Sequence, residues 1–265
     1  MTQTALIAGT GALPALLAAA RPDMLICELE GFASAIPGAD PLRFRVERLM
    51  PFLNLLLSRG IREVCFAGAI QRPKIEPTKF DLRTLVLVPR IMAAIQAGDD
   101  ATLRAVIALF EEKGLTVVGA DSIAPDLLAG EGVLCGAVSD QDRKDMVRAR
   151  DIVAAIGAVD VGQGAVVARG LCLAVEALPG TDAMLRFVAE TRKVHHAGGV
   201  LFKAPKPGQD LRIDMPAIGP QTIARAAEAR LSCIAWPAGG ALLLDRGATI
   251  AAAAQAGITL WGIGG

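Results

Sequence analysis

The stretch Thr4-Ala-Leu-Ile-Ala-Gly-Thr-Gly-Ala-Leu-Pro14 joins a short apolar run to a glycine turn and a proline. The apolar run predicts a strand, and the alanine-rich residues 15–20 predict a helix that starts at the turn. Such a turn offers backbone N–H groups and the positive end of a helix dipole to an anion. We therefore predict that Gly9, Thr10 and Gly11 bind substrate. A plain strand-to-helix turn is the alternative, because the third glycine of a dinucleotide fingerprint is missing.

The residues that follow repeat this alternation of strand and helix. Strands are predicted at residues 24–28, 62–67 and 115–119, with a helix at 46–59 that is interrupted near Pro51. This spacing indicates a Rossmann-like parallel sheet, whose ligands bind beyond the carboxyl ends of the strands. Arg72 follows one of these strands, so we expect it to bind phosphate or sugar, unless it is only a surface cation.

Two further helices, at residues 82–96 and 100–113, are separated by Gly98-Asp-Asp100. An aspartate before a helix is typical of an N-cap, and this is the favoured interpretation of Asp99 or Asp100. A carboxylate pair in a turn can also bind a divalent ion or a ribose, which we keep as the alternative. After residue 120 the periodicity fades, which predicts a domain boundary between residues 133 and 139.

The second half has a different pattern, with hairpins as well as helices. Its predicted elements are a helix at residues 140–156 capped by Ser139 or Asp140, a hairpin that turns at Arg169-Gly170, helices at 183–190 and 220–230, and strands at 232–236, 241–244 and 259–262. We predict a Rossmann-like domain over residues 1–133 and a mixed-sheet α/β domain over residues 139–265.

Two places in this half have residues suited to a ligand. Gln163 lies between Gly162 and Gly164, which would let the backbone approach a ligand closely, although a β-bulge explains the same glycines. Thr181 and Asp182 begin a predicted helix, where free N–H groups can bind an anion. Capping by Thr181 and dipole stabilisation by Asp182 are the structural alternatives.

The stretch Lys203-Ala-Pro-Lys-Pro-Gly-Gln-Asp-Leu-Arg-Ile-Asp-Met-Pro-Ala-Ile-Gly219 concentrates charged residues between prolines. Residues 210–215 alternate, so an extended strand would place Asp210, Arg212 and Asp214 on one face. At about 3.3 Å per residue, the two aspartates would lie roughly 13 Å apart, too far to share one ion. An edge strand with a solvated charged face is the alternative, and a bulge or turn near Gly208 would change this geometry.

The composition narrows the class of protein. The 265 residues carry no formal net charge, only 4% are aromatic and none is tyrosine, so we expect no nucleic-acid partner. Mean hydropathy is +0.46, yet no apolar run reaches the ~18 residues that span a bilayer. Without a secretory signal at the start of the sequence we expect a cytoplasmic location. The five cysteines are scattered, which argues against a zinc cluster or a disulfide framework.

Taken together and in order, the motifs resemble one family. They are Gly9-Thr-Gly-Ala-Leu-Pro14, Phe66-Ala-Gly-Ala-Ile-Gln-Arg-Pro73, Gly98-Asp-Asp100, Asp160-Val-Gly-Gln-Gly-Ala-Val-Val167, Ala174-Val-Glu-Ala-Leu-Pro-Gly-Thr-Asp-Ala-Met184, Lys203-Ala-Pro-Lys-Pro207 and Arg212-Ile-Asp-Met-Pro-Ala-Ile-Gly219. The resemblance is to the LpxI family of UDP-2,3-diacylglucosamine pyrophosphatases of lipid A biosynthesis. It covers nearly the whole chain, but His195 and His196 lie outside every motif.

The resemblance implies Mg²⁺-dependent hydrolysis of a nucleotide-linked glycolipid held between two domains. Water would attack the phosphorus on the sugar side and release UMP and 2,3-diacylglucosamine 1-phosphate. The essential aspartate of the family falls on Asp214, which we expect to bind or orient the metal and water. Lys203, Lys206 and Arg212 would then bind phosphate, with Lys203 and Arg212 assisting catalysis. An apolar groove or a peripheral contact with the inner membrane is expected for the acyl chains, and a homodimer is left open.

Two other functions remain to be weighed. A nicotinamide-dependent oxidoreductase would use Gly9-Thr-Gly11 with an acidic residue about twenty positions later, either Glu28 or Glu30. A non-catalytic nucleotide-sugar binding protein would bind the ligand without turnover. The sequence does not decide whether Glu176, Asp99, Asp100 and Asp210 are functional or structural.

Overall fold

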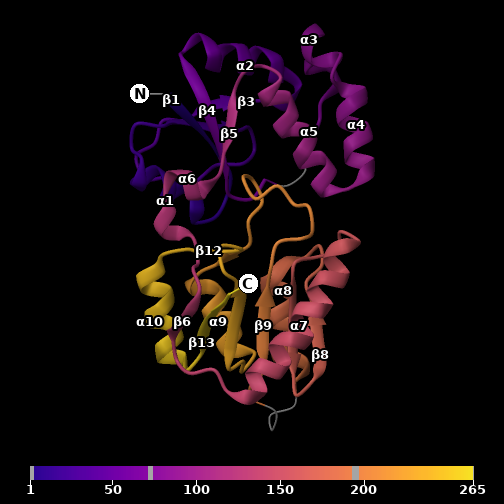
Figure 1. Ribbon diagram of the computed structural model, residues 1–265. Helices are drawn as coiled ribbons and strands as arrows, with labels where there is room; N and C mark the ends of the chain where they lie inside the picture. Colours follow the sequence, from indigo (N-terminus) through magenta and orange to yellow (C-terminus); the bar gives the residue numbers. More distant parts are fainter. Residues whose placement is uncertain (1–2, 71–73, 193–196, 265) are drawn as a thin grey trace. The chain divides into compact units, whose positions relative to one another are not determined.

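The computed structural model describes residues 3–70, 74–192 and 197–264 (Figure 1). Arg72, His195 and His196 lie outside the described residues. The chain forms two compact units, which are described separately below. The first comprises residues 1–125 together with 210–214, and the second comprises residues 126–209 and 215–265. The two-domain prediction, with domains at 1–133 and 139–265, differs in assigning residues 126–133 to the first domain and 210–214 to the second.

A parallel sheet forms the centre of the first unit. Its strand order is β3-β2-β1-β4-β5, and all neighbouring strands pair in parallel. The strands are β1 (Gln3–Ala8), β2 (Leu25–Leu29), β3 (Leu42–Phe44), β4 (Ile61–Ala67) and β5 (Thr116–Val118). This order reverses direction between β1 and β4, which is the switch point where doubly wound folds bind ligands. The predicted Rossmann-like sheet is confirmed.

Helices of the first unit pack on this sheet through apolar side chains. They are α1 (Leu13–Ala20), α2 (Leu49–Ser58), α3 (Leu82–Leu85), α4 (Val88–Ala97), α5 (Asp99–Glu111) and α6 (Ala120–Ile123). Phe52 and Leu53 of α2 and Phe110 of α5 join Ile7 and Val64 of the sheet in one buried cluster. Helices α1 and α6 contact each other, and α1 also contacts β1 while α6 contacts β4. Two 3₁₀ turns, η1 (Val46–Arg48) and η2 (Pro77–Lys79), complete the unit.

Two local expectations for these helices were wrong. Pro51 does not interrupt α2, since it lies in the first turn, where a missing N–H leaves no helical hydrogen bond unmade. Helix α5 begins at Asp99, so the N-cap position belongs to Gly98 rather than to either aspartate. Gly98 has a φ of 120°. A positive φ favours glycine at this position, so the N-cap position falls on Gly98, before both aspartates.

The second unit is built on a mixed sheet in the order β6-β13-β11-β9-β7-β8. Strands β9, β11 and β13 are parallel, whereas β6 pairs antiparallel with β13, and β7 pairs antiparallel with both β8 and β9. The strands are β6 (Gly132–Cys135), β7 (Gly164–Ala168), β8 (Leu171–Val175), β9 (Val200–Lys203), β11 (Cys233–Pro237) and β13 (Thr259–Ile263), with a separate parallel pair formed by β10 (Ala217–Ile218) and β12 (Leu242–Leu243). The mixed α/β fold predicted for the second half is confirmed.

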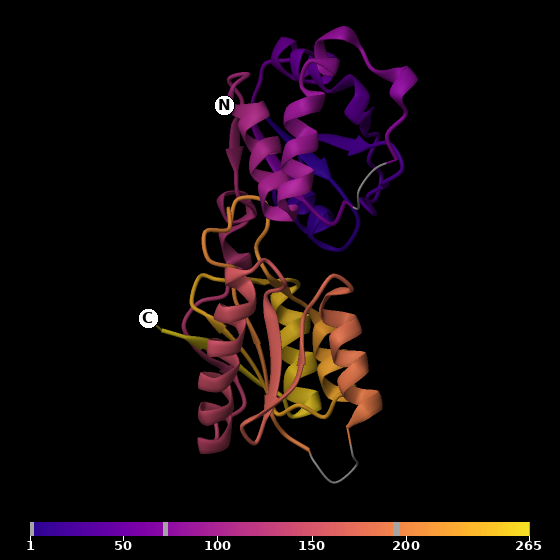
Figure 2. The same ribbon diagram turned by 90° about the vertical axis from the view of Figure 1, so that its right-hand side faces the viewer.

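Helices cover both faces of this sheet (Figure 2). Helix α7 (Asp140–Ala158) packs on one face, where Met146 and Val153 meet Phe202. The other face carries three helices, α8 (Gly180–Thr191), α9 (Pro220–Glu228) and α10 (Arg246–Ala256). Adjacent residues of β9 point to opposite faces, as expected for a strand. Phe202 packs in the cluster under α7, whereas Leu201 packs in the cluster under α8, α9 and α10.

The ends of these elements follow the sequence closely. Ser139 caps α7, so it is Ser139 rather than Asp140 of the two predicted caps, and it forms a capping box with Asp142. Arg169 and Gly170 both have positive φ, at 52° and 78°, which is the backbone of a tight hairpin turn. The buried carboxylate of Asp145 accepts the N–H groups of both turn residues at 2.9 and 2.7 Å. Helix α7 thereby fixes the turn of the predicted hairpin.

The cysteines are free, as expected from their spacing. Cys27, Cys65 and Cys233 are buried in strands, and burial raises the pKa of each thiol, to about 12 for Cys27 and Cys65. Cys172 lies exposed on the edge strand β8. Thiols with such raised pKa values are protonated at neutral pH, so the buried cysteines act as small apolar side chains.

Candidate active site

Residues 210–214 form a turn, so the strand predicted for residues 210–215 was wrong. The chain bends at Gly208, whose φ is +74°, and the N–H groups of Ile213 and Asp214 both donate to the carbonyl oxygen of Asp210 at 3.3 and 3.2 Å. The predicted alternative of a turn near Gly208 is the one observed. Because Asp210 and Asp214 are one turn apart, the separation of roughly 13 Å expected for a strand no longer applies.

Arg212 is the residue that holds this turn. Its Nε and Nη2 donate to the two oxygens of Asp210 at 2.9 and 2.6 Å, while Nη1 donates to Glu111 of α5 at 2.6 Å. Two carboxylates therefore engage the guanidinium that was predicted to bind phosphate. The hydrogen bond from Arg212 holds the pKa of Asp210 below its ordinary value. Asp210 and Arg212 together anchor the turn on the first unit.

Asp214, the predicted catalytic and metal-binding residue, is half-buried at the end of this turn. Among the described residues, no group of three or more His, Cys, Asp or Glu side chains is arranged to hold a metal ion. A single carboxylate nevertheless fits Mg²⁺, which commonly takes one or two protein carboxylates and completes its shell with waters and substrate phosphates.

The loops after β1 and β4 lie together at the switch point of the first sheet. Thr10 and Ala69 exchange backbone hydrogen bonds at 3.0 and 2.9 Å, and the Gly9 N–H donates to the Ala67 carbonyl at 2.8 Å. A Cβ atom on Gly9 would lie 2.6 Å from the Ala69 carbonyl oxygen, so close packing of the two loops requires glycine there. The N–H groups of Gly9 and Thr10 are thus already donated within the two loops. Thr10 and Gly11 are both exposed, and Gly11 has a φ of +104°.

Asp121 is a neighbour of the turn that the sequence did not reveal. It lies in α6, just after β5, and its Oδ1 would be 2.2 Å from a Cβ atom on Gly119. The same added atom would be 3.5 Å from the Cα of Arg212. Gly119 therefore makes room where the side chain of Asp121 and the anchored turn meet, at the carboxyl end of β5.

In the second unit, Lys203 is the centre of a buried polar cluster. It ends β9 with only 4% of its surface exposed, and its Nζ donates to Thr181 Oγ1 at 2.6 Å. Glu176 Oε2 lies 3.7 Å from the same Nζ. The structure thus brings together Lys203 and Thr181, which were both predicted site residues, and adds Glu176.

The glycines beside Gln163 make room for Glu176. A Cβ atom on Gly162 would lie 1.9 Å from the backbone oxygen of Glu176, and one on Gly164 would lie 2.5 Å from Glu176 Oε2. The close approach that the glycines predicted is thus an approach of Glu176. The buried Oε1 of Gln163 has no hydrogen-bond partner within the part of the chain that the structure describes.

Thr181 and Asp182 lie in the first turn of α8, but capping by Thr181 was a wrong prediction. The helix begins at Gly180, so Thr181 is inside it and its hydroxyl oxygen accepts the hydrogen bond from Lys203. First-turn N–H groups have no carbonyl partner within their own helix and remain suited to an anion. Asp182 is exposed in the same turn, where a carboxylate is also stabilised by the helix dipole.

Lys206, also a predicted substrate ligand, pairs with an aspartate near helix α7. Its Nζ forms an ion pair of 2.6 Å with Oδ1 of Asp160, which lies two residues after the end of α7. Gly157 of α7 packs beside Lys206 and Pro207, since a Cβ atom on it would lie 3.0 Å from Pro207. The segment after Lys203 is therefore fastened to α7 before it reaches the turn of residues 210–214.

An apolar groove of about 280 Å³ lies between β8 and the first half of α8. Its walls include Val175, Pro179, Ala183, Met184 and Phe187. Phe187 is 52% exposed. The groove reaches Gly180, the residue before Thr181, so apolar surface and the polar cluster of Lys203 share the same helix start.

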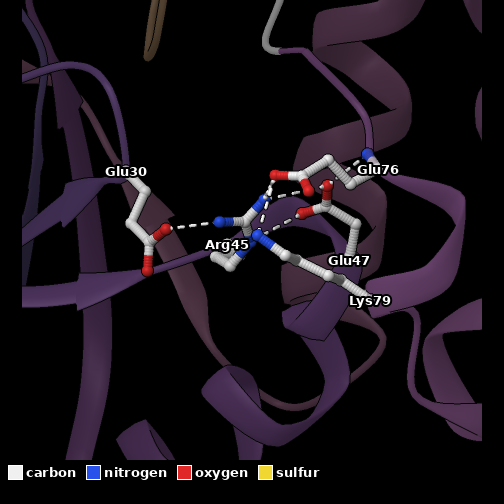
Figure 3. Close-up of polar contacts among 5 residues, drawn as sticks. All are labelled: Glu30, Arg45, Glu47, Glu76 and Lys79. Carbon is white, nitrogen blue, oxygen red and sulfur yellow. Dashed lines mark hydrogen bonds and ion pairs between the residues drawn. The ribbon is translucent and has the colours of Figure 1, made fainter.

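A second cluster of charges, in the first unit, surrounds Arg45 (Figure 3). Glu30 and Glu76 pair with the guanidinium at 2.6 and 2.7 Å, and Glu47 pairs at 3.3 Å. Glu28 at the end of β2 accepts the N–H and O–H of Ser34 at 2.7 and 2.6 Å. Both acidic residues considered for binding a nicotinamide ribose are therefore engaged by their own neighbours, which leaves the oxidoreductase alternative without a free carboxylate at the predicted place.

The fold and these clusters define a class of protein: a two-unit α/β protein with a Rossmann-like sheet in one unit and, in the other, a buried lysine at a helix start, which is suited to a phosphate group. Comparison with known families narrows this class. Residues 3–127 match the LpxI N-terminal domain and residues 130–261 match the LpxI C-terminal domain, so the chain belongs to the LpxI family.

A similar protein comes from Caulobacter vibrioides (strain ATCC 19089 / CIP 103742 / CB 15). It is named UDP-2,3-diacylglucosamine pyrophosphatase LpxI and is 41% identical over 278 residues, covering 99% of this chain and 98% of the relative. The resemblance noted in the sequence motifs is thus confirmed at the level of the family.

Proposed function

We propose that the protein hydrolyses the pyrophosphate bond of UDP-2,3-diacylglucosamine in lipid A biosynthesis, with Mg²⁺ as cofactor. The observation that carries this proposal is the match to a relative of that name along 99% of the chain. The buried Lys203 beside a helix start and the turn that presents Asp214 supply the types of group that such chemistry requires. We propose that both act on the same substrate.

Hydrolysis of a phosphoanhydride needs charge neutralisation on the phosphate oxygens and a water aligned with the leaving group. In the proposed reaction, the oxygen of water forms a bond to the phosphorus that carries the sugar, and the bond from that phosphorus to the bridging oxygen of UMP breaks. The products are UMP and 2,3-diacylglucosamine 1-phosphate. Asp214 orients the water or holds Mg²⁺, and Mg²⁺, when bound, neutralises charge on the phosphate oxygens.

Lys203 and the first turn of α8 would bind a phosphate of the substrate. The ammonium has three N–H donors, and one of them goes to Thr181, so a phosphate oxygen can take another. The first-turn N–H groups of α8 would bind a further phosphate oxygen. In this proposal Arg212 does not bind phosphate itself but holds Asp210 and the turn in place. Direct binding of substrate by Gly11 and Lys206 stays a prediction.

The groove between β8 and α8 would take an acyl chain of the substrate. The name of the relative specifies two acyl groups on the sugar, and the groove offers apolar walls beside the proposed phosphate site. No helix within the described ranges combines the length and apolarity needed to cross a membrane. Peripheral membrane contact stays a prediction, which flotation with phospholipid vesicles would check.

The test is incubation of the purified protein with UDP-2,3-diacylglucosamine and Mg²⁺, with release of UMP followed by chromatography. We expect UMP and the sugar 1-phosphate in equal amounts, and no UMP when EDTA is present. Binding of the substrate without any UMP release would favour a non-catalytic nucleotide-sugar binding protein. Release of UMP that persists in EDTA would contradict the proposed role of Mg²⁺.

A further inference from the structure

Lys203 is a cation placed where few cations are found. Its side chain is 6% exposed, and burial of an ammonium costs free energy unless an opposite charge lies close. Glu176 provides that charge, with Oε2 at 3.7 Å from Nζ. This distance is beyond a hydrogen bond, so the two groups interact through charge while Thr181 receives the hydrogen bond.

The surrounding backbone is built to hold Glu176 in this place. Its N–H donates to the carbonyl oxygen of Gly164 at 2.8 Å, at the start of strand β7. Gly162 and Gly164 leave the space that its backbone and carboxylate occupy, although glycine is unfavourable in a strand such as β7, which Gly164 begins. Gly164 is also the register partner of Lys203 across the β7–β9 pairing. One short stretch therefore seats both the carboxylate and the lysine.

Stability alone does not explain this arrangement. Glu176 Oε2 is buried and has no hydrogen-bond partner among the described residues. A buried ion pair is often no more stable than a well-packed apolar pair of similar size, and an unsatisfied buried oxygen adds a cost. A pair of this kind, at the start of the helix that offers N–H groups to an anion, points to use of the ammonium.

We propose that Glu176 is a positioning residue for Lys203: it holds the ammonium beside Thr181, where a phosphate group of the substrate binds. The proposal rests on the proposed function for the identity of that phosphate. Glu176 touches no substrate atom in this view and acts through Lys203.

Two possible roles of Glu176 predict opposite effects on anion binding. A carboxylate near an anion site repels the anion, so Glu176→Gln should tighten anion binding if the residue only contributes negative charge. If Glu176 positions Lys203, the same substitution should weaken binding and turnover. The sign of the change therefore separates the two roles.

The experiment compares Glu176→Gln, Glu176→Asp, Lys203→Met and the double variant Glu176→Gln/Lys203→Met, with exposed Glu190→Gln on α8 as the matched control. We expect Glu176→Gln to lower kcat/KM for UMP release at least ~10-fold, and Glu176→Asp to recover part of the loss. In the Lys203→Met background, Glu176→Gln should cost no more than about twofold further. Fully independent losses in the double variant would mean that Glu176 contacts substrate itself and would overturn the proposal.

Two measurements need no turnover and so keep this proposal separate from the proposed function. The first is calorimetric binding of inorganic pyrophosphate, which should weaken in Glu176→Gln and in Lys203→Met. The second is the NMR signal of the Lys203 ammonium, assigned by its loss in Lys203→Met, which should move or broaden in Glu176→Gln.

Circular dichroism at the assay temperature identifies any variant that fails to fold. If wild-type protein releases no UMP, the proposed function fails, and these two measurements still decide the role of Glu176. Unchanged pyrophosphate affinity with an unchanged Lys203 signal overturns the positioning role.

Discussion

Arg212 binds Asp210, two residues before it, through both carboxylate oxygens, with Nε to Oδ1 at 2.9 Å and Nη2 to Oδ2 at 2.6 Å. The N–H of Arg212 also donates to Oδ1, at 3.1 Å. The second arm of the guanidinium reaches Glu111, so the same residue closes the turn and fastens it to α5. Asp214 ends the same turn, and its N–H donates to the carbonyl oxygen of Asp210 at 3.2 Å.

The pair makes the turn sensitive to acid. Arg212 lowers the pKa of Asp210 in the folded state, so the stabilisation is complete above the unfolded value of about 3.9 and is lost as the pH falls through the lower folded value. We expect Asp210→Asn to reduce the free energy of unfolding at pH 7 by about 1 kcal/mol, because the pair is partly exposed. The variant should also lose less stability than wild type between pH 4 and pH 2.

Urea unfolding of the wild type and Asp210→Asn at neutral and acidic pH checks this. Exposed Asp23→Asn is the control and should behave like the wild type at both. A variant that keeps the full acid dependence of the wild type would show that another carboxylate is responsible.

The turn also shows where sequence reasoning reaches its limit. The alternation of residues 210–215 fits a strand, but the bidentate pair from Arg212 to Asp210 satisfies both charges locally and makes a turn more favourable. Alternation counts side chains by face and carries no information on which charges will pair. The bend at Gly208 was visible as an alternative, whereas the contact with Glu111, about a hundred positions earlier, had no local signal.

The glycines next to Gln163 are a second feature that the sequence predicted only in part. The pattern Gly162-Gln-Gly164 correctly indicated a close approach, because glycine in a strand has a cost that something must offset. It did not indicate what approaches. The neighbour is Glu176, brought in by the hairpin that turns at Arg169-Gly170, and only the register of β7 with β8 reveals it. By contrast, most helices and the strands with a clear apolar run follow from local periodicity and turn residues. The strands β3, β6, β9 and β10 were not predicted.

Asp214 should be required for turnover and less so for binding. We expect Asp214→Ala to lower kcat by ~10²–10³ or more, since it removes the carboxylate proposed to hold Mg²⁺ or orient water. Calorimetry with UDP-2,3-diacylglucosamine should still detect binding, because the phosphate and acyl contacts of the second unit remain. Exposed Asp126→Ala is the control and should retain activity. Near-normal turnover in Asp214→Ala would remove this residue from the mechanism.

The groove beside α8 should matter for acylated substrate. Phe187→Ser replaces an apolar wall, and loss of about 1 kcal/mol of apolar contact corresponds to an increase in KM of roughly fivefold. The effect should shrink for a substrate analogue with short acyl chains, since fewer methylene groups reach the wall. Leu82→Ser on α3, where the leucine is 83% exposed, is the matched control. Equal effects of Phe187→Ser on long-chain and short-chain substrates would argue that the chain binds elsewhere.

The cluster around Arg45 should contribute to stability rather than to catalysis. Glu47 is 3% exposed and accepts the N–H of Glu76 at 2.7 Å as well as the guanidinium of Arg45. Burial raises its pKa, but these hydrogen bonds outweigh burial and hold the pKa below the ordinary value. We expect Glu47→Gln to cost roughly 2 kcal/mol at pH 7, because the buried position of Glu47 loses the charge that a guanidinium and a backbone N–H both use as acceptor.

The pH dependence follows from the same direction of shift. The stabilisation from Glu47 is complete above the unfolded pKa of about 4.3 and is lost as the pH falls through the lower folded value, so wild type and Glu47→Gln should converge in acid. Lys79→Met removes an exposed partner of the same cluster and should cost less than about 1 kcal/mol. Urea unfolding of the two variants, together with UMP release at saturating substrate, separates the roles. Because the carboxylates that pair with Arg45 are engaged with one another's neighbours in the first unit, folded Glu47→Gln should keep its kcat, and a selective loss of kcat would place the Arg45 cluster in the reaction instead.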